Sequence, residues 1–332
     1  MAVTLIPTLA PHPAALACAL VIDAALGDPV YDAHPVRLIG RTLATFERGL
    51  RAIDADGYVG GSILFVALSI VWVAGISVLV ALVHTASPAL AWIVHVFVVY
   101  SLLAVGDLMA HVWRVERAVR RGDLLAARGA VAQLVGRDTD QMEAGDCRRA
   151  AIESLSENLT DGFTSPLFWY VIAGLPGLVL FKVVSTMDSM VGNKTPQYLR
   201  FGWCGARMDD AMNFVPARLT WMFIALAAIA IPGCSARKAL RIGWQQHGLL
   251  PGPNSGWSEA ATAGAIQGRL VGPIRMNGIL VTDAWLGDPA DPPVESGRAF
   301  SLAVAVTVAT ATLASAIAVS YLAFAPNAFT SY

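Results

Sequence analysis

The sequence predicts an all-α, polytopic membrane protein with about four to five transmembrane helices, and two observations support that prediction. Hydrophobic residues make up 56% of the 332 residues and charged residues only 14%, whereas soluble domains carry about 25% charged residues. Three runs contain no Asp, Glu, Lys or Arg: Ser62 to His84, Pro88 to Gly106 and Ala299 to Ala325. Each is close to or longer than the ~20 apolar residues that a helix needs to cross a membrane.

Three further apolar runs are shorter or interrupted: Ala14 to Leu26, Leu219 to Ile231 and Pro166 to Val184. Each is a candidate for a span, an interfacial helix or a re-entrant hairpin. The last run contains Gly174 to Gly177, "GLPG", which is typical of a turn, and irregular backbone is tolerated at membrane depth where protein buries it. We therefore expect Phe168 to Val184 to enter the membrane and return as a hairpin.

The positions of the basic residues predict the orientation of the chain. No Lys or Arg occurs before Arg37 or after Arg298, whereas the segment 107–165 contains several. Because basic loops stay in the cytoplasm, we expect both chain ends outside and 107–165 inside, as a cytoplasmic layer of amphipathic helices. We treat 1–332 as a single integral membrane domain in which the polar segment 233–298 is also cytoplasmic. The sidedness of 185–216 relative to 233–298 stays open, because a single crossing between them would separate two basic segments.

Several kinds of site have no support in the sequence. The four cysteines, Cys18, Cys147, Cys204 and Cys234, are scattered without a Cys/His cluster, so neither a zinc site nor a disulfide framework is indicated. No basic stripe with interleaved aromatic residues indicates nucleic acid. The glycine-rich phosphate-binding motifs are missing, so any nucleotide must be held by acids through Mg²⁺ and by Arg or Lys.

Three acids precede the Pro166 run at helical spacing. Glu153, Glu157 and Asp161 are four residues apart, so a helix would place all three on one face, with Asn158 beside them. Like charges at this spacing destabilise an isolated helix by about 0.2 to 0.5 kcal/mol per pair, which indicates a bound cation. Mg²⁺ suits one or two carboxylates together with waters and phosphates. The alternative is a solvated acidic face that ends near Asp161.

A second group of ionisable residues lies in a chain segment that is otherwise apolar. Its members are Asp188, Lys194, Arg200, Arg207, Asp209, Asp210, Asn213 and Arg218. In a helix, Arg207 would lie one turn from Asp210, and Asp209 one turn from Asn213. We expect Arg207 to bind phosphate oxygens bidentately and Lys194 to act as a mobile point charge. The alternative is a belt of ion pairs at the membrane interface, although ionisable groups beside membrane segments are by default functional.

Two further motifs combine polar groups with structural residues. The string "GDPVYDAHPVRLIGR" contains Asp28, Asp32, His34, Arg37 and Arg41. His34 titrates near neutrality and could serve as an acid or base, but a lone histidine before a proline is more often a structural hydrogen-bonding residue. The string "NSGWSEAATAGAIQGRL" has small residues that permit close helix packing. The larger residues around them are Asn254, Trp257, Glu259 and Arg269.

Six strings in this order resemble one known family. They are "GDPVYDAHPVRLIG", "VGRDTD", "RAAIESLSENLTDGFTSPLFWY", "DSMVGNK", "FGWCGARMDDAMNFVPARLT" and "NSGWSEAATAGAIQGRLVGP". Together they are similar to the CobD/CbiB family of cobalamin biosynthesis, the adenosylcobinamide-phosphate synthases. The resemblance runs from about Asp23 to Gly287, and the Ser-Glu-Asn string followed by Pro-Leu-Phe-Trp-Tyr is its most specific part.

The resemblance implies a ligase of the inner (plasma) membrane whose active site faces the cytoplasm. Members of the family join the free propionate carboxylate of adenosylcobyric acid to aminopropanol or its O-phosphate, and they consume ATP with Mg²⁺. Amide formation requires an activated carboxylate, most simply an acyl phosphate, which calls for a metal-bridged triphosphate and nearby cations. The further partners would be membrane lipid and a possible second copy of the chain, without nucleic acid.

The resemblance also gives roles to the residues singled out above. The metal ligands would be Glu153, Glu157 and Asp161, and the catalytic residues would be these three with Arg207 and Asp210. The substrate-binding residues would be Asp28, His34, Arg37, Asn158, Asp188, Lys194, Asp209, Asn213, Arg218, Asn254, Trp257, Glu259 and Arg269.

One loop departs from the family pattern. After Gly192 the chain reads "NKTPQY", with Pro196 and Gln197 where relatives commonly show Glu and a base. The identity of the aminoalcohol, and whether it is phosphorylated, therefore stays open. The competing interpretation is a transporter or accessory membrane subunit that binds a corrinoid without catalysis, which broken helices near the membrane midplane would favour. The concentration of acids and bases in loops, with Asp23 and Lys182 as the main exceptions, favours the ligase.

Overall fold

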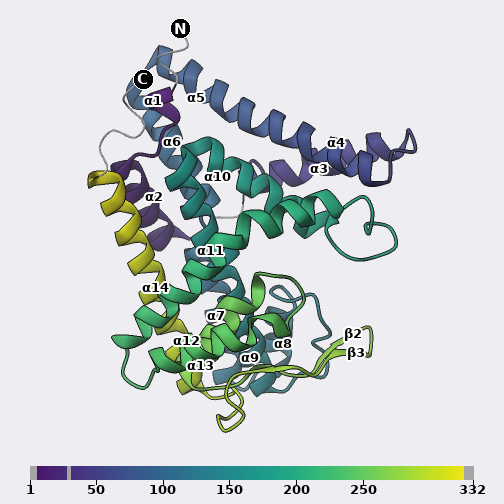
Figure 1. Cartoon of the computed structure of the whole chain (residues 1–332), viewed down its shortest axis with the longest axis vertical. Coiled ribbons are helices and arrows are strands. Elements are labelled where there is room, and N and C mark those ends of the chain that lie inside the picture. The colour runs from purple at the N-terminus through teal and green to yellow at the C-terminus, as the bar shows by residue number, and fades with distance from the viewer. Residues whose placement is uncertain (1–5, 28–30, 325–332) are drawn as a thin grey trace. The chain divides into compact units, whose positions relative to one another are not determined.

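The computed structural model describes residues 6–27 and 31–324, and these residues are almost entirely helical (Figure 1). Contacts divide the chain into two compact units. Unit 1 comprises Met1–Ala104, Ser165–Asn213 and Ser315–Tyr332, and unit 2 comprises Val105–Thr164 and Phe214–Ala314. The predicted helical segment 107–165 lies in unit 2 apart from its last residue, and 233–298 lies there completely.

Unit 1 begins with helices whose starts are set by the sequence. Proline occupies the first turn of α2, α3 and α6, where its missing N–H costs no hydrogen bond. The unit contains α1 (Ile6–Leu9), α2 (Pro13–Leu26), α3 (Pro35–Arg51), α4 (Tyr58–Ser69), the π-helix η2 (Ile70–Ala74), α5 (Gly75–Ala86), α6 (Pro88–Leu102), α10 (Ser165–Val191), the first part of α11 (Trp203–Ile229) and the end of α14 (Gly297–Phe324).

Five helical stretches are long and apolar enough to cross a membrane, as predicted. They are Tyr58–Ala86, Pro88–Arg120, Ala144–Val191, Trp203–Ile229 and Gly297–Phe324. The shorter apolar helix Pro13–Leu26 adds a sixth candidate. The run Leu219 to Ile231, which looked too short, is the end of a helix that begins at Trp203, so its length was underestimated because polar residues precede it. The fold is that of an all-α polytopic membrane protein.

The expected hairpin at Phe168 to Val184 takes a different form. The segment belongs to α10, which is helical on both sides of a break at Ala173 and Gly174. Gly174 has a φ of 62°, which glycine adopts without strain, and Pro176 then stands in the first turn of the resumed helix, where proline is tolerated. The Gly-Leu-Pro-Gly string therefore makes a break within a helix and not a hairpin with its own loop.

The core of unit 1 holds the loop that carries Lys194. Apolar side chains of α3, α4 and α10 pack against Phe201, and the buried set is Ile39, Leu43, Leu64, Leu68, Val183, Met187, Val191 and Phe201. Gly61 lets α4 approach the loop closely, because a Cβ there would lie 1.8 Å from the carbonyl oxygen of Phe201. The loop between α10 and α11 is thereby fixed at its second end.

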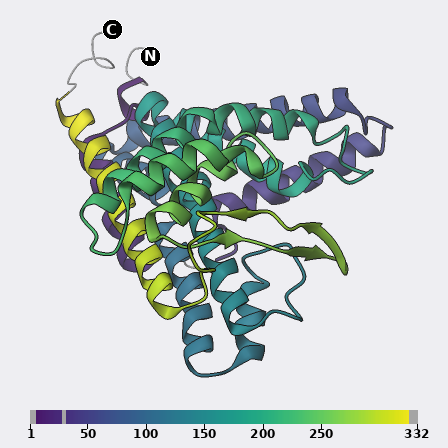
Figure 2. The same cartoon turned by 60° about the horizontal axis from the view of Figure 1, so that its bottom comes forward.

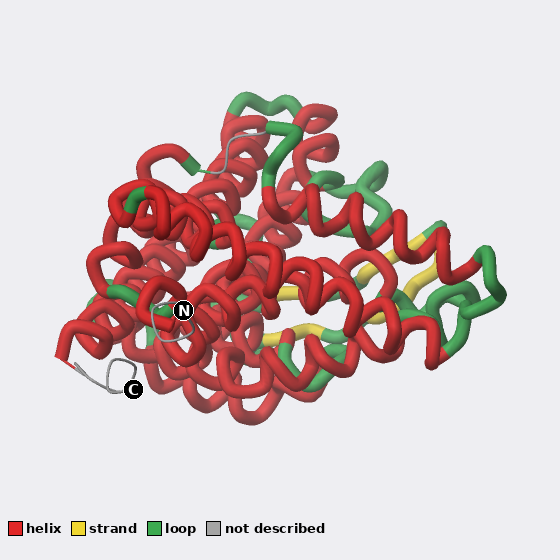
Figure 3. The backbone as a smooth tube through the Cα atoms, turned by 90° about the horizontal axis from the view of Figure 1, so that it is seen from above, coloured by secondary structure: helices red, strands yellow, loops and turns green. Residues whose placement is uncertain are grey.

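Unit 2 combines helices with two very small sheets. It contains α7 (Val105–Arg120), α8 (Leu124–Val131), α9 (Ala144–Asn158), the π-helix η3 (Leu159–Thr164), α12 (Ala236–Gln246), the 3₁₀ turn η4 (His247–Leu249) and α13 (Ser255–Ile266). The strands are β1 (Leu270–Val271), β2 (Ile274–Met276), β3 (Ile279–Thr282) and β4 (Trp285–Leu286). Figure 3 shows how small this strand content is beside the helices. The sequence analysis predicted no strand.

The strands form two antiparallel pairs. β1 pairs with β4, and β2 pairs with β3 as a hairpin that projects beside the helices of unit 2 (Figure 2). The hairpin turns at Asn277 and Gly278, which have φ values of 51° and 75°, as a two-residue turn of this kind requires. The Asp138 carboxylate accepts hydrogen bonds from both turn N–H groups, at 3.0 Å and 2.7 Å, and so anchors the turn to the loop before α9.

Small residues allow α13 to be buried, as the sequence indicated. Every residue from Gly256 to Ile266 is buried. Gly264 lies so close to α12 that a Cβ there would be 2.5 Å from the carbonyl oxygen of Lys238. Glu259 is carried into the interior on this helix, where an ionised carboxylate needs a partner or a proton.

Candidate functional site

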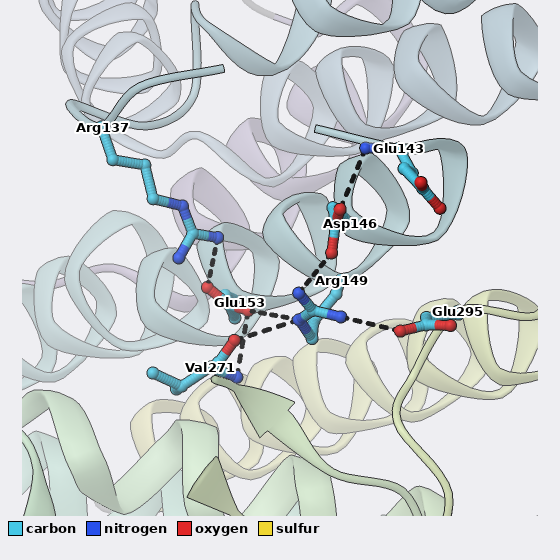
Figure 4. A network of polar contacts seen from close by, with 7 residues as sticks. All are labelled: Arg137, Glu143, Asp146, Arg149, Glu153, Val271 and Glu295. Atoms are coloured by element: carbon cyan, nitrogen blue, oxygen red, sulfur yellow. Dashed lines mark hydrogen bonds and ion pairs between the residues drawn. The ribbon is translucent and has the colours of Figure 1, made fainter. Parts of the chain in front are cut away.

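Glu153 on α9 is a buried carboxylate of unit 2. Its Oε2 atom lies 2.6 Å from Nη2 of Arg137, and its Oε1 atom accepts a hydrogen bond from the Val271 backbone N–H at 3.0 Å. Both charged side chains are only 9% exposed. Figure 4 shows Arg137 reaching Glu153 from the loop before α9 while Val271 approaches from β1. Both oxygens of Glu153 are thus held by segments remote in sequence.

Arg149, one turn before Glu153, joins the same network (Figure 4). Its guanidinium donates to the Val271 carbonyl oxygen and to Glu295 Oε1, both at 3.0 Å, and it pairs with Asp146. Its distance to Glu153 is longer, at 3.9 Å. Arg149 therefore ties α9 to β1 and to the segment before α14, which holds the Glu153 backbone in place.

Three carboxyl groups interact with a fourth, that of Glu259. Glu157, Glu153 and Asp161 disfavour its ionised form by charge repulsion, whereas the positive charge of Arg137 favours it. Burial, followed by these neighbouring carboxylates, raises the pKa of Glu259 well above its usual range. The π-helix η3, in which Asp161 lies, widens the helix at this point, and π-helical turns are frequent at functional sites.

Acidic side chains of this group line a cleft of about 410 Å³. Glu153, Glu157 and Glu259 lie on its wall together with Arg137 and Ser154. The remaining wall is mostly apolar and comes from the segment 134–135, the loop 250–251 and the β2–β3 hairpin. A concave apolar site with a few converging polar groups is the usual form of a small-molecule site.

These acids fit Mg²⁺ only in the manner of a metal shared with phosphate. Within residues 6–27 and 31–324, no three His, Cys, Asp or Glu side chains are grouped so that they could hold a metal ion by themselves. Glu153 pairs with Arg137, so a metal here would be held by Glu157 and Asp161. Mg²⁺ is typically held by one or two carboxylates, waters and substrate phosphates, so this donor set suits it.

Unit 1 contains a separate group of aspartates. Asp209 interacts electrostatically with Asp188 and Asp210, and its carboxylate accepts a hydrogen bond from Asn213 Nδ2 at 2.9 Å. Asn213 is 1% exposed and accepts a hydrogen bond from the Ser165 hydroxyl. The i to i+4 relation between Asp209 and Asn213 is therefore present as the sequence indicated.

Two exposed cations stand beside this group. Arg207 lies one turn from Asp210, with Nη1 3.7 Å from Oδ2, and its side chain is 68% exposed. Lys194 is exposed in the loop between α10 and α11 and also acts on Asp210. The contact at 3.7 Å is too long for a bidentate ion pair, so the guanidinium keeps donors available for a ligand.

The other predicted residues of unit 1 lie near the start of α3. His34 is buried, precedes the first residue of α3 and meets the Tyr31 ring edge to face, with ring centroids 5.2 Å apart. Arg37 is exposed on the first turn of α3. Asp28 lies outside the described residues.

The remaining predicted residues of unit 2 contact other protein groups. Arg218 donates to Asn254 Oδ1 at 2.9 Å and lies over the Trp257 ring, which stacks on His247 at 3.8 Å. Asn158 donates to the Ser154 carbonyl oxygen of its own helix. Arg269 lies over the Trp285 ring, and its backbone bonds to Pro292 and Val294. In this conformation these groups bind protein.

Two arginines of the network were missing from the predicted site. Arg137 and Arg149 fall in "VGRDTD" and "RAAIES", two of the strings that carry the family resemblance, and that was the signal available. Arg149 also precedes Glu153 by four residues, which places the two on one helix face. The Val271 contact has no such local signal, because it joins positions 118 residues apart.

The chain was compared with known proteins. A family described as CobD/Cbib protein matches residues 16–307. The chain belongs to this family. A cobalamin biosynthesis protein CobD of Rhizobium meliloti is 37% identical over 94% of this chain and 96% of its own length.

Enterobacterial members of the family are similarly close. The cobalamin biosynthesis protein CobD of Klebsiella pneumoniae is 39% identical over 81% of this chain and 85% of its own. The cobalamin biosynthesis protein CbiB of Salmonella typhi is 38% identical over the same shares. No solved structure matches the chain.

Proposed function

We propose that this member of the CobD/Cbib family is an ATP-dependent amide ligase of cobalamin biosynthesis. It joins the free propionate carboxylate of adenosylcobyric acid to aminopropanol or its O-phosphate. The observation that carries the proposal is that Glu153, Glu157 and Glu259 line a partly apolar cleft with the Arg137 guanidinium, while Asp161 interacts electrostatically with Glu259. The names of the relatives as cobalamin biosynthesis proteins supply the pathway.

The cleft would bind the reacting carboxylate and the phosphates. Glu157 and Asp161 would hold Mg²⁺, which supplies charge neutralisation for the phosphate oxygens. Arg137 lies at the cleft and offers guanidinium donors to a carboxylate or phosphate, since only one of its nitrogens engages Glu153. Glu153 fixes the orientation of Arg137, and burial raises the pKa of Glu259, which favours its protonated form.

The aspartate group of unit 1 would bind phosphate through its cations. Arg207 supplies a planar fork of donors and Lys194 a compact charge on a loop, and both act on Asp210 in the absence of ligand. In the proposed function these cations would bind a phosphate group at this place in unit 1. Asp209, fixed by Asn213, orients the helix turn that carries Arg207.

The proposed location follows from the substrates. ATP and corrinoids are cytoplasmic, so the acid cleft would face the cytoplasm from a multi-pass protein of the inner (plasma) membrane. Five helical stretches of the described residues could span a membrane. The segment 233–298 connects the last two of them, Trp203–Ile229 and Gly297–Phe324. Cysteine-accessibility labelling at Ser185 and at Asn254 tests the arrangement, and labelling of both positions from outside would contradict it.

A second candidate function is a transporter or accessory subunit that binds a corrinoid without catalysis. The break in α10 at Ala173 and Gly174 is the observation in its favour, because broken helices are common in transporter binding sites. Such a protein would bind the corrinoid and release no phosphate when ATP and amine are added.

The deciding experiment uses the full chain purified in detergent. Adenosylcobyric acid, ATP and Mg²⁺ are supplied with aminopropanol or with its O-phosphate. The products are identified by mass spectrometry, and phosphate release is measured in parallel. We expect an amide product with one of the two amines and ATP hydrolysis coupled to it. Corrinoid binding without ATP turnover with either amine would replace the ligase with the second candidate.

A further inference from the structure

The β2–β3 hairpin carries an apolar face that no other part of the described chain covers fully. Met276 is 43% exposed, Ile279 is 70% exposed and Val281 is 58% exposed. The hairpin lies outside the five stretches that could span a membrane. Apolar side chains gathered on one exposed face commonly mark a binding surface.

The register of the hairpin places its side chains on two distinct faces. Met276 pairs with Ile279 on one face, and Arg275 pairs with Leu280 on the opposite face. The pairing then shifts by one residue, so that Ile274 pairs with Thr282 and Val281 lies at the irregularity. Ile274, Met276 and Val281 line the acid cleft of about 410 Å³. Arg275 instead lines a second cavity on the other side, of about 500 Å³. The apolar face therefore continues the wall of the cleft outward.

We propose that this apolar face is the platform on which the corrin ring of the substrate rests while its propionate arm enters the acid cleft. The inference rests on the proposed function and adds to it the position of the macrocycle. The platform consists of Ile274, Met276, Ile279 and Val281.

Size is the first argument for this occupant. A cavity of about 410 Å³ lies within the range of about 300 to 1,000 Å³ that drug-sized ligands occupy. A corrinoid is far larger than such a ligand, so the cleft can take an arm of the molecule but not its ring. The ring must then lie on the surface that borders the cleft, and the hairpin provides the apolar part of that border.

Polarity is the second argument. The platform borders polar and charged groups of the cleft, among them Arg137, Glu153 and Glu157. The turn of the hairpin is held by the Asp138 carboxylate. A corrin ring has broad apolar faces and a polar edge of amide arms, so it matches an apolar strip beside polar groups.

The hairpin is also suited to adjust to a ligand. A two-stranded hairpin is marginally stable by itself, and here the contacts of Asp138 with Arg275, Asn277 and Gly278 hold it to the loop 132–143. The same loop carries Arg137. A ring on the platform and an arm at Arg137 would thus be held by one connected segment.

The test is direct binding of adenosylcobyric acid to the full chain in detergent, without ATP, by equilibrium dialysis. Ile279→Ser combined with Val281→Ser should raise the Kd about tenfold, because two partly covered apolar side chains are lost from the contact. Leu280→Ser, on the opposite face of the same hairpin, is the matched control and should change the Kd less than twofold. Ile279→Leu combined with Val281→Ile keeps the face apolar and should bind as the wild type.

The outcomes separate this inference from the proposed function. If the wild type binds the corrinoid and makes the amide, but the double serine variant has an unchanged Kd, the platform is wrong and the ligase stands. If Leu280→Ser weakens binding as much as the double variant, the effect is loss of hairpin structure and the platform is likewise rejected. If the wild type makes no amide yet the double variant alone loses affinity, the platform stands and the ligase fails.

Discussion

The two acidic groups of the molecule neutralise their charge in opposite ways. In unit 2, Glu153 binds Arg137 and the Val271 N–H. The side chains of Glu153 and Arg137 are each only 9% exposed. In unit 1, Arg207 lies 3.7 Å from Asp210 with a side chain that is 68% exposed. A buried pair fixes geometry, whereas an exposed pair contributes little to stability and leaves its cation free to bind a ligand. The acidic group of unit 2 is therefore rigid, and that of unit 1 is exposed and adaptable.

The largest expected effect comes from removing a carboxylate that is proposed to hold the metal. Glu157→Gln should lower kcat by more than about a hundredfold while the protein stays folded in detergent, because Mg²⁺ loses a charged ligand. The measurement is ATP-dependent amide formation over a range of Mg²⁺ concentrations. Asp140→Asn, an exposed acid in the loop before α9, is the matched control and should keep the wild-type rate. A near-normal rate in the Glu157 variant would remove this face from the mechanism.

Breaking the locked pair should have the next largest effect, on stability. Arg137→Met leaves Glu153 buried without its cation and should lower the free energy of unfolding by about 3 kcal/mol. Adding Glu153→Gln removes the stranded charge and keeps an acceptor for Val271, so it should restore at least half of the loss. Thermal unfolding in detergent measures both variants, and exposed Arg114, changed to Met, serves as the control. A double variant no more stable than the single one would show that the pair is not what locks the site.

The exposed pair of unit 1 should respond in kinetics rather than stability. Arg207→Lys keeps the charge but loses the bidentate fork, so kcat and kcat/KM should fall together by about tenfold with an unchanged melting temperature. Arg200→Lys, exposed in the loop before α11, is the matched control. Wild-type kcat with an unaltered KM for ATP would reduce Arg207 to a partner of Asp210.

The smallest effect concerns pH. Because the pKa of Glu259 is raised in the folded chain, the folded state binds its proton more tightly than the unfolded state does. The resulting stabilisation is complete below the unfolded pKa of about 4.5 and is lost as pH rises toward the folded value. Glu259→Gln mimics the protonated group, so its melting temperature should fall less than that of the wild type as the pH is raised above about 4.5. Parallel curves for the two proteins would contradict the shift.

Much of the fold could be predicted because a membrane-spanning helix requires one continuous run of apolar residues. The charge-free stretches Ser62 to His84, Pro88 to Gly106 and, as far as Phe324, Ala299 to Ala325 lie in helices that could cross a membrane. The start of α11 was missed because polar groups such as Asp209 and Asn213 occupy its first turns. The hairpin was missed although Asn277 and Gly278 are a strong turn signal, since strands of three and four residues fall below the length over which alternation is visible.

The candidate site was predictable only where its residues share a helix. Glu153, Glu157 and Asp161 follow from spacing, and so does Asp209 with Asn213, because periodicity describes one helix at a time. Arg137 and Val271 reach Glu153 from a loop and a strand, and no local pattern predicts which distant segments will meet. The metal and substrate roles of these residues stay predictions that the variants above test.

The division of the chain into interleaved units has a consequence for how the protein is made. The chain leaves unit 1 after Ala104, returns to it at Ser165, leaves again after Asn213 and returns at Ser315. During synthesis from the N-terminus, unit 2 is therefore complete at Ala314, while unit 1 still lacks its last helical turns. We expect a chain that ends at Ala314 to contain every residue of the acid cleft and yet to be recognised by quality-control proteases, since unit 1 is incomplete.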